Sequence, residues 1–308
     1  MTKLIFVHGI NNENRDDRPN SADIIRETWL GAISDTATRM GVELPGGIDC
    51  CAAFYGDELA DSSSNWDSDL VNVSTMGSAS SDADYVDDGV MALYREYQRF
   101  YNIQDRDVLA ELDERDDVHY VRMAGGIHKS WLKAITRALE KVIPTRGRYI
   151  AKVALRQAAA YLHKRGLKEQ IDDIVMDQVF KTIGTDEKVI VVAHSLGTVV
   201  TYDLLRRLRH TLNVDLFLTL GSPLGIEIVK DRLGPPLLFP KNVKRWVNGA
   251  DNEDFVALYP QLNRRTFGDD TIINISNLDN GYEDAHSITQ YLSHPEVIAE
   301  LVSAMKLS

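Results

Sequence analysis

Apolar residues along the chain follow two different spacings, and the change of spacing divides the chain into two kinds of sequence. Near both ends, short continuous apolar runs alternate with amphipathic stretches, whereas residues 57–186 show mainly helical spacing. Continuous apolar runs are typical of parallel strands that are buried on both faces. The pattern therefore predicts an α/β core with a helix-rich insertion.

The N-terminal part predicts a β-α-β unit. Residues 4–7 are continuously apolar, residues 21–40 place apolar side chains on one helical face, and residues 48–55 form a second β-rich run. Gly41 ends the helical pattern. A right-handed crossover between two parallel strands is the expected connection.

The same alternation resumes after the insertion. The expected elements are strands at 189–193, 214–220, 243–248 and 271–275, and helices at 196–210 and from 295 to about 305. Together with the two N-terminal strands, these predict a mostly parallel central sheet of about six strands flanked by helices.

Five helical patterns make up the insertion, and a polar stretch rich in Ser and Asp precedes them at 61–84. The helical patterns lie at about 86–102, 105–115, 128–143, 147–165 and 167–183. We therefore predict a core made of residues 1–57 and 185–308, and an inserted helical cap at 58–184.

Charge is distributed unevenly along the chain. The formal net charge of −12 argues against nucleic acid as a partner, because binding phosphates needs a basic face. Residues 57–117 hold 17 Asp and Glu against 4 Lys and Arg, whereas residues 121–170 hold 12 Lys and Arg against 2 Asp and Glu. Two interpretations remain open: the segments pair with each other, or the basic segment contacts an anionic membrane surface.

The cellular location and the cofactors follow from what the sequence lacks. No apolar run reaches the ~18 residues of a membrane span. The apolar run at 4–7 is also too short for a signal peptide, so a cytoplasmic protein is expected.

The two cysteines, Cys50 and Cys51, are adjacent, which excludes a disulfide framework and gives no metal-ligand spacing. No cofactor and no metal are expected.

Residues 187–208, EKVIVVAHSLGTVVTYDLLRRL, predict a strand, a one-residue turn at Ser195 and a helix. This is the setting that an exposed nucleophilic serine requires. The residues two before and two after the serine must be small so that strand and helix can approach, and Ala193 and Gly197 meet that requirement. The alternative interpretation is a turn serine that caps the following helix.

Three segments carry a family resemblance: IFVHGI on the first strand, VVAHSLGTVVTYDLL around Ser195, and TLGSPLG after the next strand. They resemble the α/β-hydrolase superfamily, within its lipase- and esterase-like serine hydrolases. RWVNGADNEDFVA and DAHSITQYL are similar to the acid and histidine segments of such proteins. The resemblance covers residues 1–55 and 185–308, and it does not extend to the insertion.

The resemblance implies a catalytic triad in the order Ser, acid, His. It implies Ser195 as the nucleophile and His286 as the general base. Asp254 matches the family's acid because it precedes a hydrophobic dipeptide, and Asp251 is the rival candidate. His294 is the rival to His286, but its place beside a helix start favours a capping or surface role.

The resemblance also implies an oxyanion hole built from the backbone N–H groups of Ile10 and Leu196. Gly9 is expected to let the backbone at Ile10 approach the substrate carbonyl closely. His8 and His194 are interpreted as structural residues, because His8 shapes its loop and His194 faces away from the nucleophile.

These observations together predict a serine hydrolase that cleaves carboxylic esters through an acyl-enzyme intermediate, with a small-molecule or lipid ester as the substrate. Thioesterase, phospholipase or peptidase activity with the same triad is the first alternative, because these activities share fold and triad. A non-catalytic scaffold that binds a partner through its cap is the second.

Overall fold

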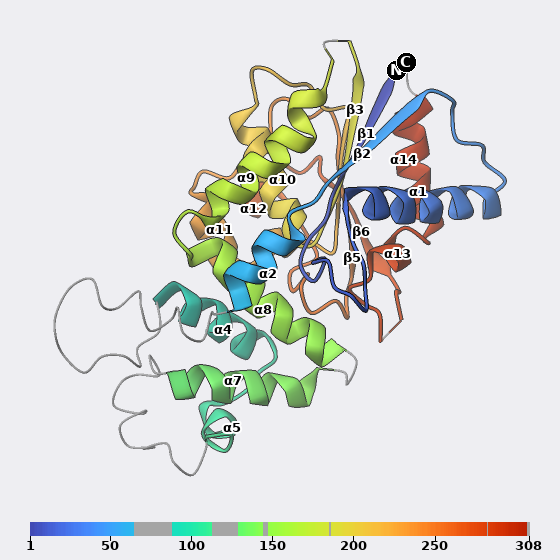
Figure 1. Ribbon diagram of the computed structural model, residues 1–308. Helices are drawn as coiled ribbons and strands as arrows, with labels where there is room; N and C mark the ends of the chain where they lie inside the picture. Colours follow the sequence, from blue (N-terminus) through green and yellow to red (C-terminus); the bar gives the residue numbers. More distant parts are fainter. Residues whose placement is uncertain (65–87, 113–128, 144–146, 185, 282, 307–308) are drawn as a thin grey trace. The chain divides into compact units, whose positions relative to one another are not determined.

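The computed structural model describes residues 1–64, 88–112, 129–143, 147–184, 186–281 and 283–306 (Figure 1). The chain divides into two compact units, residues 1–58 with 168–308, and residues 59–167. The first unit thus includes the helical stretch 168–183 that the sequence analysis assigned to the insertion. In this stretch Lys168 Nζ lies 2.5 Å from Asp203 Oδ2, Asp172 Oδ2 lies 2.6 Å from Arg207 Nη2, and Ile171 and Val175 are fully buried.

The first unit is built on a six-stranded sheet in the order β2-β1-β3-β4-β5-β6, and every neighbouring pair is parallel. The strands are β1 (Thr2–Val7), β2 (Ile48–Ala53), β3 (Lys188–His194), β4 (Leu216–Leu220), β5 (Trp246–Asp251) and β6 (Ile273–Leu278). The predicted α/β fold with about six strands is confirmed. The last two strands begin and end two or three residues later than expected.

Strand β1 lies between β2 and β3, so the connection after β1 runs toward one edge of the sheet and the connection after β3 runs toward the other. Leu4 pairs with Cys50 of β2 on one side and with Ile190 of β3 on the other. The loops that follow β1 and β3 therefore meet at the point where the strand order reverses. In open parallel sheets, ligands bind at the carboxyl ends of the strands at such a switch point.

Helices cover both faces of this sheet in the first unit (Figure 1). Helices α1, α13 and α14 lie on one face, and α9, α10, α11 and α12 lie on the other. Their bounds are α1 (Ala22–Arg39), α9 (Leu167–Gln178), α10 (Leu196–Arg207), α11 (Glu227–Leu233), α12 (Arg264–Phe267), α13 (Ile288–Tyr291) and α14 (Pro295–Lys306). Short 3-10 turns lie at η2 (Phe180–Thr182) and η3 (Pro223–Gly225).

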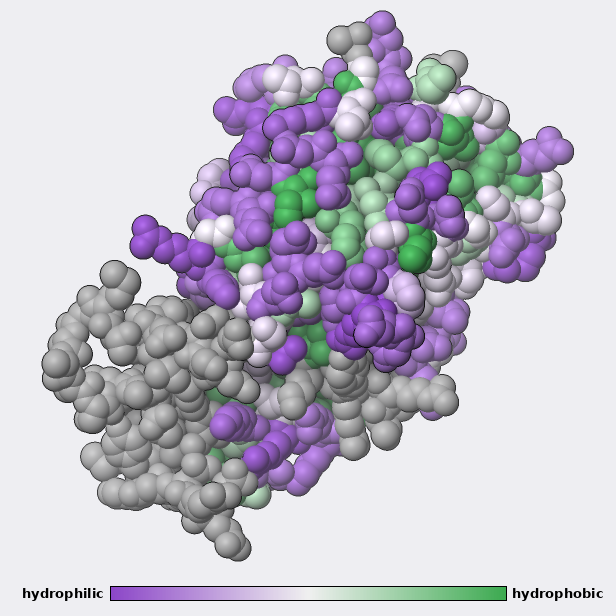
Figure 2. Space-filling view, in the orientation of Figure 1, coloured by the Kyte–Doolittle hydropathy of each residue, from purple (hydrophilic) through white to green (hydrophobic). Residues whose placement is uncertain are grey.

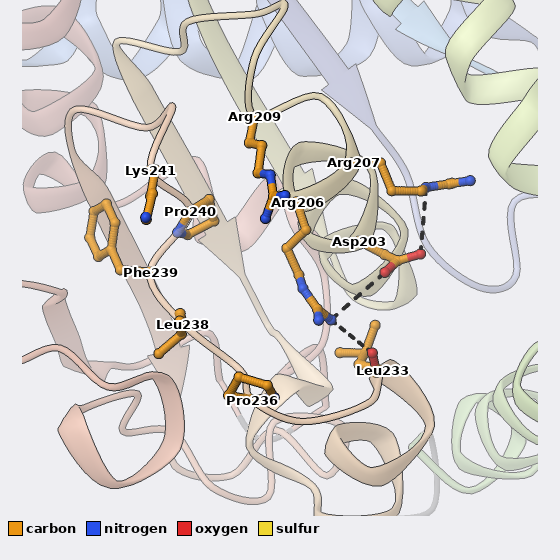
Figure 3. A pocket seen from close by; sticks show the side chains of 10 residues that line it. All are labelled: Asp203, Arg206, Arg207, Arg209, Leu233, Pro236, Leu238, Phe239, Pro240 and Lys241. Atoms are coloured by element: carbon orange, nitrogen blue, oxygen red, sulfur yellow. Dashed lines mark hydrogen bonds and ion pairs between the residues drawn. The ribbon is translucent and has the colours of Figure 1, made fainter.

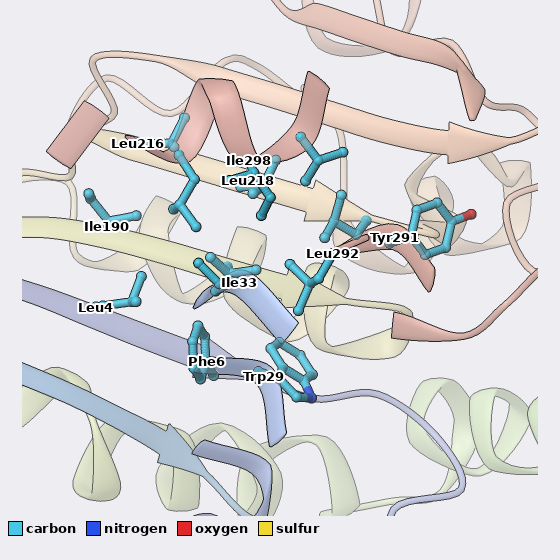
Figure 4. Close-up of a cluster of buried hydrophobic side chains, with 14 of the residues drawn as sticks. Leu4, Phe6, Trp29, Ile33, Ile190, Leu216, Leu218, Tyr291, Leu292 and Ile298 are labelled. Carbon is cyan, nitrogen blue, oxygen red and sulfur yellow. The ribbon is translucent and has the colours of Figure 1, made fainter. Parts of the chain in front are cut away.

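A buried apolar cluster fixes the sheet against α1, α13 and α14 (Figure 4). Phe6 of β1 packs on Trp29 of α1 with ring centroids 5.1 Å apart, and Ile33 and Tyr291 are fully buried in the same cluster. Burial of each such side chain is worth about 1.5–3 kcal/mol. The cluster therefore gives the loops at the carboxyl edge a rigid base.

The second unit is helical in its described part. Its helices are α4 (Asp88–Phe100), α5 (Asp105–Leu109), α7 (Lys129–Val142) and α8 (Gly147–His163), and α2 (Gly56–Ser64) crosses the boundary between the units. On α7, the apolar stripe predicted from the sequence is buried, with Trp131, Ile135 and Leu139 at 4% exposure or less. The polar stretch predicted at 61–84 begins inside α2, and its remainder lies outside the described residues.

The described surface is mixed in character. Figure 2 shows hydrophilic side chains over most of the visible coloured face, with smaller hydrophobic areas between them. Within the described ranges, no helix combines the length and the apolar character that a membrane crossing requires. Part of the basic segment 121–170 lies outside the described residues. In its described part, Lys141 pairs with Glu111 of the acidic segment, and Arg137 donates to the Glu111 carbonyl oxygen at 2.8 Å, as the pairing interpretation expects. Contact with a membrane surface stays a prediction.

Candidate functional site

The predicted site residues lie on loops at one edge of the sheet. Because all six strands are parallel, their carboxyl ends meet at that edge. Ile10 follows β1, Ser195 follows β3, Asp254 follows β5 and His286 follows β6. Hydrogen bonds join Ser195, His286 and Asp254 into one continuous chain.

The backbone of Ser195 is strained. Its φ of 55° and ψ of −132° lie in a region that residues other than Gly rarely adopt, at a cost of about 1–3 kcal/mol. The Ser195 N–H donates to Leu220 O at 3.0 Å, which helps to hold this turn. Its side chain makes no capping bond to α10, so the interpretation of Ser195 as a helix cap is wrong. The hydroxyl instead lies 2.9 Å from His286 Nε2.

Close packing around this turn explains the small residues near Ser195. A Cβ on Gly197 would lie 2.3 Å from His8 O, and a Cβ on Gly9 would lie 2.3 Å from Ser195 Cβ. Neither glycine could therefore carry a side chain without a backbone shift. Ala193 is buried within β3 and pairs in register with both neighbouring strands.

His286 is held by Asp254. Its Nδ1 lies 2.9 Å from Asp254 Oδ1 and 2.8 Å from Oδ2. An ionised carboxylate only accepts hydrogen bonds, so Nδ1 carries the hydrogen and Nε2 is left to accept from the Ser195 hydroxyl. This is the hydrogen-bond pattern that a general base for a serine hydroxyl requires.

Asp251 and His294, the rival candidates, lie outside this chain and hold the loop that carries His286. The Asp251 carboxylate accepts the N–H groups of Glu253 at 2.7 Å and Asn280 at 2.6 Å. Nε2 of His294 lies 2.9 Å from Asn280 Oδ1, and Asn280 Nδ2 donates to the carbonyl oxygen of Ala285 at 2.7 Å. Asn280 thus links both rival residues to the segment just before His286.

The peptide group between Gly9 and Ile10 is fixed in orientation. Its carbonyl oxygen lies 2.7 Å from His8 Nδ1 and accepts from Asn12 Nδ2 at 3.3 Å. Because a trans peptide points its N–H away from its C=O, these contacts also fix the direction of the Ile10 N–H. The Leu196 N–H belongs to the first turn of α10, where amides have no acceptor within the helix.

Buried His8 is neutral and has a defined tautomer. Tyr55 N–H donates to His8 Nε2 at 3.1 Å, so the ring hydrogen is on Nδ1 and is donated to Gly9 O. Burial lowers the pKa of His8 to about 4. The loop-shaping role expected for His8 therefore has a specific form: its ring orients the Gly9–Ile10 peptide.

His194 lies against His286, which the sequence analysis did not foresee. Their ring centroids are 4.6 Å apart. Burial, followed by the neighbouring His286, lowers the pKa of His194 well below its ordinary value. A neutral ring therefore supports one side of the His286 imidazole.

The sequence analysis also missed Tyr291, whose hydroxyl donates to Asp254 Oδ2 at 2.7 Å. The residue lies within the DAHSITQYL segment, where a tyrosine near the histidine is the only signal. The spacing of residues along the chain could not show that Tyr291 contacts the Asp254 carboxylate on the loop after β5. The contact depends on how α13 packs against the sheet.

Other reactive groups offer no second centre in the described part of the chain. Within those residues, no group of three or more His, Cys, Asp or Glu side chains is placed to hold a metal ion. Cys50 and Cys51 lie on β2, where burial raises their pKa values to about 12 and about 11. Few thiolates form at neutral pH under these conditions, so both cysteines are poor nucleophiles.

A basic cavity of about 380 Å³ lies at the other end of α10, beside the loop that follows α11 (Figure 3). Arg206 donates there to Leu233 O at 2.7 Å and to Gly234 O at 3.1 Å. Arg207 pairs with Asp172 at 2.6 Å. These cations therefore have structural partners, and their position in the last turn of α10 suits the helix dipole.

Comparison of the chain with models of known protein families, with curated proteins and with solved structures finds no match. Function is therefore inferred from the residues and the geometry of the chain itself.

Proposed function

We propose that the protein is a serine hydrolase of carboxylic esters, of the esterase- or lipase-like kind found in the α/β-hydrolase superfamily. The observation that carries the proposal is the hydrogen-bond chain from Ser195 Oγ through His286 to Asp254, with links of 2.9 Å and 2.8 Å. The positive φ of Ser195 and its place at the sheet's switch point support the same assignment.

In the proposed first half-reaction, Ser195 Oγ attacks the acyl carbon of the ester while its proton passes to His286 Nε2. Asp254 stabilises the imidazolium that forms. The N–H groups of Ile10 and Leu196 hold the negative oxygen of the tetrahedral intermediate. The intermediate then expels the alcohol, which takes the proton from His286, and leaves an acyl-Ser195 ester.

In the second half-reaction, His286 accepts a proton from water, and the hydroxide attacks the acyl carbon. The new tetrahedral intermediate breaks down to free carboxylic acid, and Ser195 Oγ regains the proton from His286. The sum is one ester and one water converted to one acid and one alcohol. No metal and no redox cofactor has a part in these steps.

The test is hydrolysis of p-nitrophenyl esters of increasing acyl length by wild type and by Ser195→Ala, with circular dichroism as the check on folding. We expect turnover by the wild type and a loss of about 10⁴-fold or more in Ser195→Ala. A folded wild type without turnover on any ester would contradict the proposal, as would a Ser195→Ala variant as active as the wild type.

Matched thioester and amide substrates test the ester assignment separately. We expect the ester to have the highest kcat/KM of the three for a given acyl group. If the thioester or the amide has the higher kcat/KM, the assignment of the triad is retained and the proposed substrate class is wrong.

A further inference from the structure

Tyr291 joins the apolar core to the candidate acid. Its ring belongs to the fully buried cluster against the sheet, and its hydroxyl points away from the neighbouring leucine and isoleucine side chains (Figure 4). The hydroxyl has two polar partners, one at the end of β5 and one on the loop that follows: it accepts from Asp251 N–H at 3.1 Å and donates to Asp254 Oδ2 at 2.7 Å.

The buried carboxylate of Asp254 depends on such donors. Its side chain is fully buried, and a buried carboxylate is costly unless hydrogen bonds or opposite charges stabilise it. Oδ1 accepts from Val256 N–H at 2.8 Å, and Oδ2 accepts from the Tyr291 hydroxyl. Both oxygens also face His286 Nδ1. The fixed donors therefore set the direction in which the carboxylate meets the imidazole.

We propose that Tyr291 is a positioning residue, which holds the Asp254 carboxylate aimed at His286 during ester hydrolysis. The inference rests on the proposed function. Tyr291 donates one hydrogen bond throughout and transfers no proton, because burial, followed by the Asp254 charge, raises its pKa well above the ordinary value. The titratable groups that face this network are Asp251, His286 and His194, whose ring centroid lies 6.0 Å from that of Tyr291.

The test compares two tyrosines that differ in what their hydroxyls contact. Tyr291→Phe removes the hydroxyl and keeps the ring in the core. Tyr202→Phe is the matched control, because the Tyr202 hydroxyl is also buried, donates to Leu238 O at 2.8 Å and accepts from Leu238 N–H at 3.0 Å. Both variants lose one donor and one acceptor, but only Tyr291 contacts the candidate acid.

For Tyr291→Phe we expect kcat for a p-nitrophenyl ester to fall about tenfold with KM unchanged, since the lost bond matters most when His286 is charged. With one donor to Asp254 lost, the carboxylate attracts a proton on the His286–Asp254 pair more strongly, so the low-pH limb of the kcat/KM profile moves up by about one pH unit. Tyr202→Phe should lower Tm by a similar amount while keeping the kcat and the pH profile of the wild type.

A purely structural role for Tyr291 would lower Tm and leave both kcat and the low-pH limb unchanged, and this result would overturn the proposal. Failure of the proposed function is recognised separately, because the wild type itself would then show no turnover. The low-field proton NMR signal of the His286 Nδ1–H gives a readout without activity. It should shift in Tyr291→Phe and stay in place in Tyr202→Phe; an unchanged signal in Tyr291→Phe contradicts the proposal.

Discussion

The two ends of helix α10 are built from opposite kinds of interaction. At its start, Ser195 lies among buried groups, of which His8 and His194 are held neutral by burial. At its end, Arg206 and Arg207 form ion pairs with carboxylates on α9 and α10, and the guanidinium of Arg207 is half exposed. The candidate chemistry therefore lies at the start of the helix, around Ser195, which we call the dry end because its groups are buried. Charged residues lie in the last turn, at Arg206 and Arg207, which we call the wet end because these side chains are partly exposed.

The difference reflects where charge is needed. No acidic residue lies in the first turn of α10 and no side chain caps it, so its amides remain available for a negative oxygen. The last turn holds two arginines, which offset the negative end of the helix dipole. Substitutions at the dry end should affect catalysis strongly, and those at the wet end should affect only stability, and weakly.

The largest expected effect separates the two aspartates near the dry end. Asp254→Asn should lower kcat/KM for an ester by about 10³–10⁴-fold, because the amide cannot stabilise the imidazolium as a carboxylate does. Asp251→Asn should lower Tm, because the N–H groups of Glu253 and Asn280 lose a charged acceptor, and should keep most of the activity. The reverse ranking in kcat/KM would make Asp251 the acid.

The second-largest effect is expected from a change of packing at the dry end. A Cβ on Gly197 would press on the carbonyl oxygens of Val7 and His8 at 2.4 Å and 2.3 Å, so Gly197→Ala should cost about 2–3 kcal/mol in urea unfolding. Gly31→Ala in α1 is the control, because nothing lies within 4 Å of its Cβ and Ala favours helices. It should leave stability unchanged or raise it; equal losses in both variants would contradict this account of the turn.

His8, one of the two neutral histidines at the dry end, predicts a pH dependence of stability. The folded-state pKa of His8 is about 4 and its ordinary value is 6.5, so between these values the unfolded chain binds a proton that the folded chain does not. Its contribution to stability is therefore complete above pH 6.5 and is lost as pH falls toward 4. The free energy of unfolding should drop by ~2 kcal/mol between pH 6.5 and pH 5 because of this group.

His8→Gln should flatten that slope, measured by urea unfolding at several pH values. His210→Gln, which changes an exposed histidine beyond the wet end of α10, should keep the wild-type slope. Identical slopes in both variants would show that His8 is not held neutral in the folded protein.

The smallest expected effect lies at the wet end. Arg207→Gln removes one ion pair to the buried carboxylate of Asp172, which keeps its contact with Lys168 at 2.6 Å. We expect a loss of about 1 kcal/mol or less and an unchanged kcat/KM. A loss of activity larger than the loss of stability would mean that the wet end takes part in catalysis after all.

The sheet and the turn at Ser195 could be predicted from the sequence because each is marked by residues that are neighbours along the chain. Continuous apolar runs marked β1 and β3, and the small residues on either side of Ser195 marked the turn. By contrast, the contacts of Tyr291 with Asp254 and of His194 with His286 join segments that are distant along the chain. They depend on the packing of α13 and on the order of the strands, which no periodicity encodes.

The domain boundary and the choice between the two aspartates also depend on contacts that sequence periodicity does not encode. The helical spacing of residues 167–183 matches that of the insertion, whereas the ion pairs of Lys168 with Asp203 and of Arg207 with Asp172 join this stretch to α10. Asp251 ends β5, and Asp254 follows three positions later on the next loop. Their separate contacts, with the Asn280 N–H and with His286, come from the direction of each side chain.

The most direct test of the central claim is covalent labelling by a fluorophosphonate, read by intact mass and peptide mapping. We expect one adduct per chain on Ser195, none in Ser195→Ala, and a much slower reaction in Asp254→Asn than in Asp251→Asn. An unlabelled wild type that is folded, or an adduct that persists on another serine in Ser195→Ala, would contradict the assignment of Ser195 as the nucleophile.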